Sequence, residues 1–172
     1  MSYVMIDSLS LEGYVTSIIL MLLFVLFGVV LKISLSFLGS TRLHGFNFVC
    51  DEIIKPILHR KNNFQTFTRI CLWNIMISFI VICSGVISFG ILPIVWAFFN
   101  LGLFSPNADF FRRYLHSWIE EMAHIFSAAL GLWIGRNIQI FANNLPTFIE
   151  IITFIFALYV VSAFAEVAEI KL

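Results

Sequence analysis

Charged residues are scarce in this chain. Of 172 residues, 10 are Lys or Arg and 10 are Asp or Glu, so 12% of the chain is charged. Soluble domains usually carry about a quarter. Hydrophobic residues make up 60%, which excludes an ordinary soluble core and predicts an integral membrane protein. The zero net charge, with no continuous basic stripe, excludes nucleic acid as a partner.

Several recognition signals are also missing. The first residues, MSYVMIDSLSLEGY, contain no Lys or Arg, so we expect a retained first helix rather than a cleaved signal peptide. The three cysteines are odd in number, which argues against a disulfide framework or a zinc cluster. No nucleotide-binding Gly-x-x-x-x-Gly-Lys-Ser/Thr loop, nucleophile elbow, internal repeat or Gly/Ser linker is present. We therefore expect residues 1–172 to form a single integral membrane domain without a cofactor.

Long apolar runs predict the membrane-embedded helices, because one crossing takes roughly 20 helical residues. Residues 70–104 would extend about 50 Å as a single helix. Gly85, Gly90 and Pro93 predict a break near the middle of that stretch, giving a hairpin or a re-entrant piece. We expect an all-α, polytopic transmembrane helical bundle with about five membrane-embedded helices. Their approximate ranges are 14–38, 70–90, 91–104 (short or re-entrant), 114–135 and 146–168.

A surface helix is expected between the first two runs. Its apolar residues recur at helical spacing and predict an amphipathic helix on the membrane surface: Phe46, Val49, Ile53 and Ile57.

The distribution of positive charge favours five crossings over four, because short cytoplasmic loops are enriched in Lys and Arg. With five crossings, Arg136 lies alone on one side. The basic residues that share the other side are Arg42, Lys55, Arg60, Lys61, Arg69, Arg112, Arg113 and Lys171. This arrangement places the N-terminus outside and residues 40–69 in the cytoplasm.

A polar cluster begins the fourth run, in the segment HSWIEEMAH at 116–124. His116, Glu120 and His124 follow one another at i, i+4 and i+8 on one helical stripe, and Glu121 lies three residues before His124. A neighbouring stripe of small residues allows close helix packing in lipid, and consists of Ala123, Ser127, Gly131 and Gly135. We expect this side of the helix to face protein or a water-filled cavity.

Three roles are open for the polar cluster. In the first, Glu120 and His124 are structural and satisfy each other or backbone groups. In the second, they form a protonatable site, since acids and imidazoles inside membranes often mark ion or proton paths. In the third, Glu-x-x-His supplies two metal ligands, as in di-iron bundles. The motif occurs once, and His116 and His124 lie about 12 Å apart along the helix, so one metal ion cannot bind both directly.

The order of these residues resembles the stage II sporulation protein M family. Asn74, Gly85, the NLG at 100–102 and the segment LHSWIEEMAHIFSAALGLWIG fall in the register of that family, over roughly residues 62–136. The chain departs from the family pattern at three positions, where it has Leu115, Ser117 and Met122 instead of proline, glycine and proline.

The resemblance implies a multi-pass membrane protein of a prokaryotic cell membrane, without a settled enzymatic activity. Members of the family include a sporulation protein that works with peptidoglycan-remodelling partners, and small proteins made alongside circular bacteriocins that are implicated in secretion, maturation or self-protection. The resemblance also suggests that His116 and Glu120 hold the start of their helix against Asn74 or Asn100.

We therefore expect a non-enzymatic subunit or scaffold of a membrane assembly for transport, maturation or self-protection, involving a hydrophobic peptide or the cell envelope. Its expected partners are the lipid bilayer, further copies of itself or other membrane subunits, and a separate ATPase or a hydrophobic peptide. The alternatives are an ion- or proton-coupled channel or carrier that uses Glu120 and His124, and an intramembrane metal-dependent hydrolase. No catalytic or metal-ligating residue is assigned.

Overall fold

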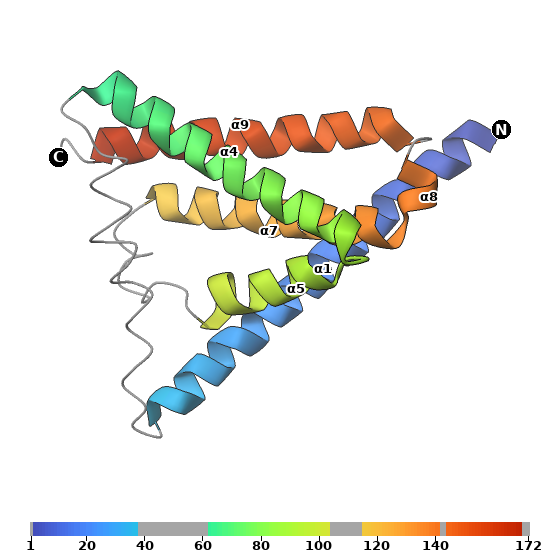
Figure 1. Ribbon diagram of the computed structural model, residues 1–172, viewed down its shortest axis with the longest axis horizontal. Helices are drawn as coiled ribbons and strands as arrows, with labels where there is room; N and C mark the ends of the chain where they lie inside the picture. Colours follow the sequence, from blue (N-terminus) through green and yellow to red (C-terminus); the bar gives the residue numbers. More distant parts are fainter. Residues whose placement is uncertain (1, 38–61, 104–114, 142–143, 170–172) are drawn as a thin grey trace.

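The computed structural model describes residues 2–37, 62–103, 115–141 and 144–169. Every secondary-structure element in these ranges is a helix (Figure 1), which confirms the all-α prediction for the described residues. In chain order they are α1 (Ser2–Phe37), α4 (Asn63–Ile87), α5 (Ile91–Trp96), the π-helix η3 (Ala97–Leu103), α7 (Leu115–Arg136), α8 (Ile138–Phe141) and α9 (Leu145–Glu169).

Three of the described helices are long and apolar enough to cross a membrane. They are Leu11–Leu35 within α1, Asn63–Ile87 and Leu145–Glu169. The apolar segment Ile91–Leu103 is shorter, and α7 occupies the fourth predicted range without the apolar character of the other three. The structure therefore does not show the expected five-span bundle. The predicted surface helix at 46–57 lies outside the described residues, and the membrane orientation stays a prediction.

The middle apolar stretch breaks into a helical hairpin. The side chain of Asn62 begins α4 by accepting a hydrogen bond from the backbone N–H of Phe64 at 2.9 Å. The chain turns after α4, where Gly90 adopts φ +86° and donates its N–H to the carbonyl of Gly85 at 2.8 Å. Glycine suits this left-handed conformation because it has no Cβ. α5 and η3 then run back along the bundle (Figure 1).

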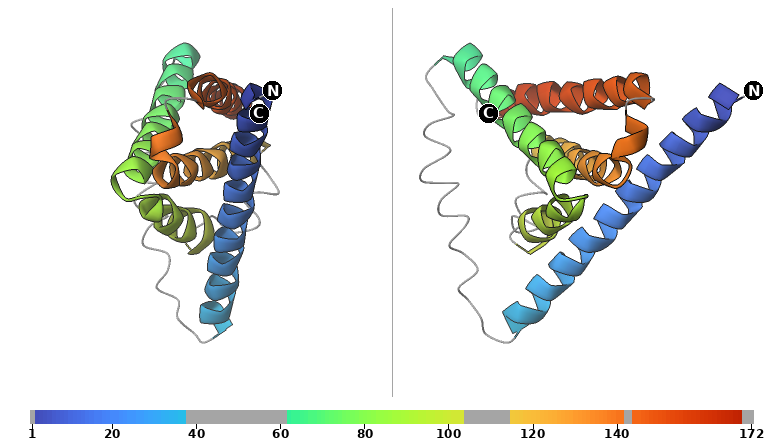
Figure 2. Two further views of the ribbon diagram at one scale, coloured as in Figure 1. Left: turned by 90° about the vertical axis from the view of Figure 1, so that its right-hand side faces the viewer. Right: turned by 45° about the vertical axis from the view of Figure 1, so that its right-hand side comes forward.

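α7 is the central helix of the described structure. It contacts α4, α9, α1 and the α5–η3 segment, and every residue from 123 to 135 except Phe126 is buried. α9 runs antiparallel to α7, α4 crosses α7 obliquely with its chain running in the same general direction, and α1 crosses them at a steep angle (Figures 1 and 2). α1 also packs tightly on η3, where a Cβ placed on Gly28 would lie 2.9 Å from the Cα of Gly102.

Candidate functional site

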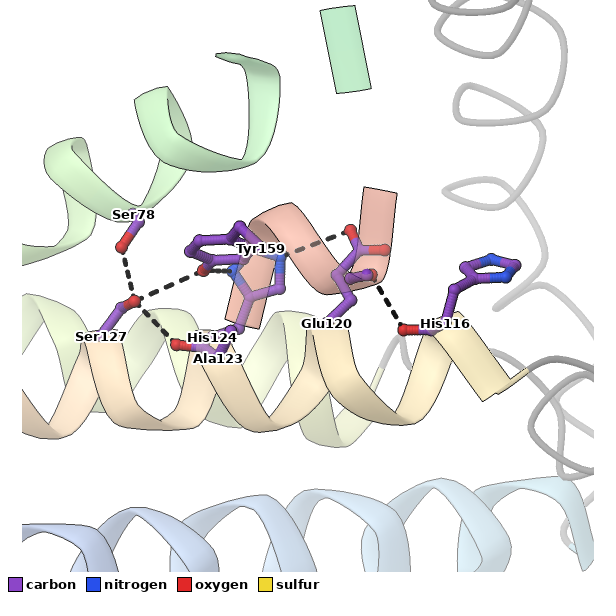
Figure 3. Close-up of polar contacts among 8 residues, drawn as sticks. Ser78, His116, Glu120, Ala123, His124, Ser127 and Tyr159 are labelled. Carbon is purple, nitrogen blue, oxygen red and sulfur yellow. Dashed lines mark hydrogen bonds and ion pairs between the residues drawn. The ribbon is translucent and has the colours of Figure 1, made fainter. Parts of the chain in front are cut away.

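A chain of hydrogen-bonded side chains joins α4, α7 and α9 inside the bundle (Figure 3). The hydroxyl oxygens of Ser78 in α4 and Ser127 in α7 are 2.5 Å apart. The hydroxyl of Ser127 lies 3.3 Å from that of Tyr159 in α9, which in turn lies 2.8 Å from Nδ1 of His124. Ser78, Ser127 and Tyr159 are completely buried and His124 is 8% exposed. The polar contacts among these four side chains therefore take the place of hydrogen bonds to water.

The hydrogens of this chain can be assigned from its geometry. Ser127 donates its single proton to the carbonyl of Ala123 at 2.7 Å, so Ser78 is the donor in the contact between the two serines. If Tyr159 donates to Nδ1 of His124, a neutral imidazole carries its proton on Nε2. In that case both hydroxyl protons are used elsewhere, and no hydrogen lies between the oxygens of Tyr159 and Ser127. A doubly protonated His124 would reverse this order, because Nδ1–H would donate to Tyr159 and free the tyrosine proton for Ser127.

His124 also connects this chain to a carboxylate and is held by two aromatic rings. Its Nε2 lies 3.6 Å from Oε1 of Glu120, one turn earlier on α7. The imidazole meets the ring of Trp96 edge-on at a centroid distance of 5.4 Å and that of Tyr159 at 5.2 Å. These contacts fix the imidazole plane, with one nitrogen toward the half-exposed Glu120 and the other toward the buried hydroxyls.

A second polar contact joins the start of α7 to the end of α9. Nδ1 of His116 lies 2.5 Å from Oε2 of Glu169, whose Oε1 accepts the backbone N–H of Leu115 at 3.0 Å. The carboxylate thus satisfies an N–H group that the first turn of α7 leaves without a partner, where the helix dipole favours negative charge. Ser162 of α9 adds a hydrogen bond from its hydroxyl to the carbonyl of His116 at 3.0 Å.

These contacts correct the expected partners of His116 and Glu120. His116 meets Glu169, and Glu120 meets His124 of its own helix, so neither holds Asn74 or Asn100. Asn100 donates its side-chain amide to the carbonyl of Trp96 at 3.1 Å, inside its own helical segment. The cause is the antiparallel packing of α9 on α7, which brings the acidic end of α9 to the start of α7.

Two buried polar atoms of the predicted cluster make no hydrogen bond to any described residue. Asn74 is 3% exposed, and its Nδ2 has no hydrogen-bond partner among the described residues. Oε2 of Glu121 is likewise buried, with no partner in the same ranges. The structure therefore links Glu120 and His124 to each other, places His116 in a separate contact, and leaves Glu121 and Asn74 outside both.

The small residues of α7 lie where it meets α4. Ala123 and Ser127 are completely buried. A Cβ on Gly85 would collide with the backbone of Gly131, and one on Gly135 would collide with the backbone of Gly85 and Gly90. Backbone therefore lies directly on backbone beyond Ser78, and the interface of α4 and α7 has no room there for water or an ion.

The described side chains include no group of three or more His, Cys, Asp or Glu residues that could hold a metal ion. His116 and His124 each contact a different acidic residue, Glu169 and Glu120 respectively.

Sequence reasoning missed five residues of these contacts. Ser78, Trp96, Tyr159 and Ser162 are in long apolar segments, and Glu169 is the last residue of α9. A serine or tyrosine hydroxyl well inside a crossing needs an internal acceptor, and this was the available signal for Ser78 and Tyr159. Nothing in the sequence indicates which helices supply their partners.

Comparison with known proteins identifies the family. The family model described as Stage II sporulation protein M matches residues 17–168, nearly the whole chain. No curated protein and no solved structure matches it. The family match confirms the resemblance seen in the sequence and extends it from α1 to α9.

Proposed function

Because the chain belongs to the stage II sporulation protein M family, we propose that this membrane protein is a non-enzymatic subunit or scaffold of a larger membrane assembly. In this proposal the assembly acts in transport, maturation or self-protection and handles a hydrophobic peptide or the cell envelope. Energy for any active step comes from a separate ATPase or from an ion gradient.

The observation that carries the proposal is the way the polar side chains of α7 are used. His124 and Ser127 bind α9 and α4, and His116 binds the end of α9. The same side chains that suggested chemistry in the sequence therefore connect three helices of one chain. A helix bundle whose helices are joined by these polar contacts can present fixed surfaces to partner proteins.

The direct test is native mass spectrometry of the tagged protein, gently extracted from its own host membrane. We expect a reproducible complex of defined stoichiometry that contains further copies of the chain, other membrane subunits or both. A tagged, unrelated multi-pass protein from the same membrane serves as the control for nonspecific capture. Recovery of a monomer without specific partners would contradict the proposal.

A second candidate function, proton-coupled transport, is favoured by one observation. The chain from Glu120 through His124 and Tyr159 to Ser127 permits two opposite proton orders, as a proton relay requires. Beyond Ser78, the contact of Gly85 with Gly131 closes the interface, so conduction would require α4 and α7 to separate. A relay therefore needs a second conformation.

Proteoliposomes distinguish the two candidates. A proton carrier predicts a pH-dependent leak from liposomes that contain the purified protein, and Glu120→Gln should abolish it. The matched control is Glu12→Gln, which removes an exposed acid of α1 outside the hydrogen-bonded chain. The scaffold proposal predicts the same flux as in empty liposomes.

A further inference from the structure

A cavity opens on the outer surface of the bundle between α1 and α9. Its volume is about 310 Å³, near the lower limit of small-molecule sites. Tyr14 and Ile18 of α1 form one wall, and Phe126 of α7 lies between the helices. The other wall belongs to α9 and consists of Glu150, Ile151 and Phe154.

Specific contacts fix the helices around the cavity. The hydroxyl of Tyr14 donates to the carbonyl of Phe126 at 3.2 Å, which fixes α1 to α7 at this level. The ring of Phe126 packs on that of Phe154 at a centroid distance of 5.8 Å, which fixes α9 on the other side. Further along α1, its contact passes from α7 to η3, where Gly28 meets Gly102.

Where α1 leaves α7, three apolar residues on one face of α7 are exposed to a large extent. Leu115, Trp118 and Met122 are 65%, 56% and 47% exposed. With Phe126 they are spaced three or four residues apart, so all four share one helical face. This face continues the cavity toward the start of α7 for about 16 Å. In the other direction the same face is occupied, because Trp133 packs against Gly13 of α1.

Glu150 gives this apolar surface a charge at one end. It is the single charged residue among those that line the cavity. It is exposed, and no hydrogen bond or ion pair joins it to any described residue. A carboxylate beside apolar walls is best matched by a cation on an otherwise apolar partner, since opposite charges attract more strongly next to a medium of low dielectric constant than in bulk water.

We propose that this groove binds one membrane-embedded helix of a hydrophobic peptide that carries a Lys or Arg near one end. The basic side chain pairs with Glu150, and the apolar face of the peptide lies on Phe126, Met122, Trp118 and Leu115. Glu150 lies one turn before Phe154 on α9, so the contact extends for about 22 Å, or roughly 15 helical residues. The inference rests on the proposed function and names the partner of the assembly.

Helix-in-groove binding explains features that other occupants leave unexplained. An acyl chain can cover the apolar residues but leaves the carboxylate of Glu150 without a cation. A lipid with an amine headgroup can pair with Glu150 and lay its acyl chains on the stripe from Phe126 to Leu115, but its chains carry no side chains at helical spacing to fit between these residues. A peptide helix with apolar anchors at intervals of three or four residues and one cation satisfies both parts of the groove.

The test measures binding of a defined probe to the full-length protein in phosphatidylcholine vesicles. The probe is a fluorescent 20-residue Leu/Ala helix with both ends blocked and a single lysine four residues from one end. A matched probe carries norleucine in place of that lysine. Energy transfer from the probe to an acceptor dye on the protein gives the affinity of each.

We expect the lysine probe to bind the wild-type protein about tenfold more tightly than the norleucine probe, as for a charge-assisted contact. Glu150→Gln should remove this preference without lowering the affinity for the norleucine probe. Glu12→Gln removes an exposed acid of α1 that does not line the cavity and should leave the preference unchanged.

Equal binding of the two probes to wild type, or a lysine preference that survives Glu150→Gln, would overturn the groove assignment. Loss of the preference when phosphatidylethanolamine is added would assign the site to a lipid amine instead. Binding of labelled protein to itself in the absence of a probe, abolished by Glu150→Gln, would assign it to a second copy. If native complexes still form while the probes show no preference, the groove assignment alone fails and the proposed function stands.

Discussion

Removal of one hydroxyl, in Tyr159→Phe, tests the buried polar chain that joins α7 to α9. The change keeps the ring and deletes the oxygen that lies 2.8 Å from Nδ1 of His124 and 3.3 Å from the hydroxyl of Ser127. A buried acceptor left without its donor costs about 1–3 kcal/mol, while hydrogen bonds between membrane helices contribute about 0.6–1.7 kcal/mol. We expect Tyr159→Phe to lower the free energy of unfolding by about 1–2 kcal/mol, because Tyr159 is fully buried and no water can replace the hydroxyl.

Thermal unfolding in detergent micelles, followed by circular dichroism, measures this loss as a decrease in Tm of about 2–8 °C. Thr153→Val on the same helix is the matched control, because the exposed Thr153 hydroxyl donates only to the carbonyl of Ile149 in its own helix. Tyr159→Phe combined with His124→Leu should cost less than the sum of the single changes, since it removes both partners of one bond. If Tyr159→Phe is as stable as Thr153→Val, the polar chain does not hold these helices together.

Three further changes test the other contacts between helices. Gly131→Ala should destabilise the protein by about 1–3 kcal/mol in the same assay, since its Cβ would lie 3.0 Å from the carbonyl oxygen of Val81; unchanged stability would contradict the close packing. Gly28→Val should separate α1 from η3 and lower the yield of a cysteine cross-link between them, while an unchanged yield would place these helices farther apart than described. Glu169→Gln should speed hydrogen exchange in the first turn of α7 by weakening the contact with His116; exchange as slow as in wild type would show that this contact contributes nothing.

Composition and local pattern were sufficient to predict the helical class of this chain. Helices overlap the expected ranges 14–38, 70–90, 114–135 and 146–168, but α1 begins earlier, at Ser2, and α4 begins earlier, at Asn63. The expected break in the middle stretch lies between α4 and α5. Both depend on short-range properties, namely side-chain hydropathy and the positions of glycine and proline. The number of crossings depends on how short or polar helices sit relative to lipid, which the pattern along the chain does not determine.

The partners of the polar cluster could not be predicted for a similar reason. Helical spacing placed His116, Glu120 and His124 on one stripe, but the structure divides them between two contacts. Tyr159 and Glu169, which make these contacts, are far away in sequence and are brought to α7 only by the antiparallel packing of α9. Spacing along the sequence therefore identified the polar face of α7, and tertiary packing determined which residues that face contacts.

The proposed scaffold function requires α4, α7 and α9 to act as one fixed body, and a disulfide between α4 and α7 tests this most directly. The hydroxyl oxygens of Ser78 and Ser127 are 2.5 Å apart, so Ser78→Cys with Ser127→Cys should form a disulfide in host membranes, in a chain whose native cysteines are replaced by alanine. Native mass spectrometry then compares the oxidised and reduced proteins. We predict that both recover the same partners at the same stoichiometry. A disulfide that fails to form, or partners that bind only after reduction, would contradict the fixed body and favour a protein that works by separating these helices.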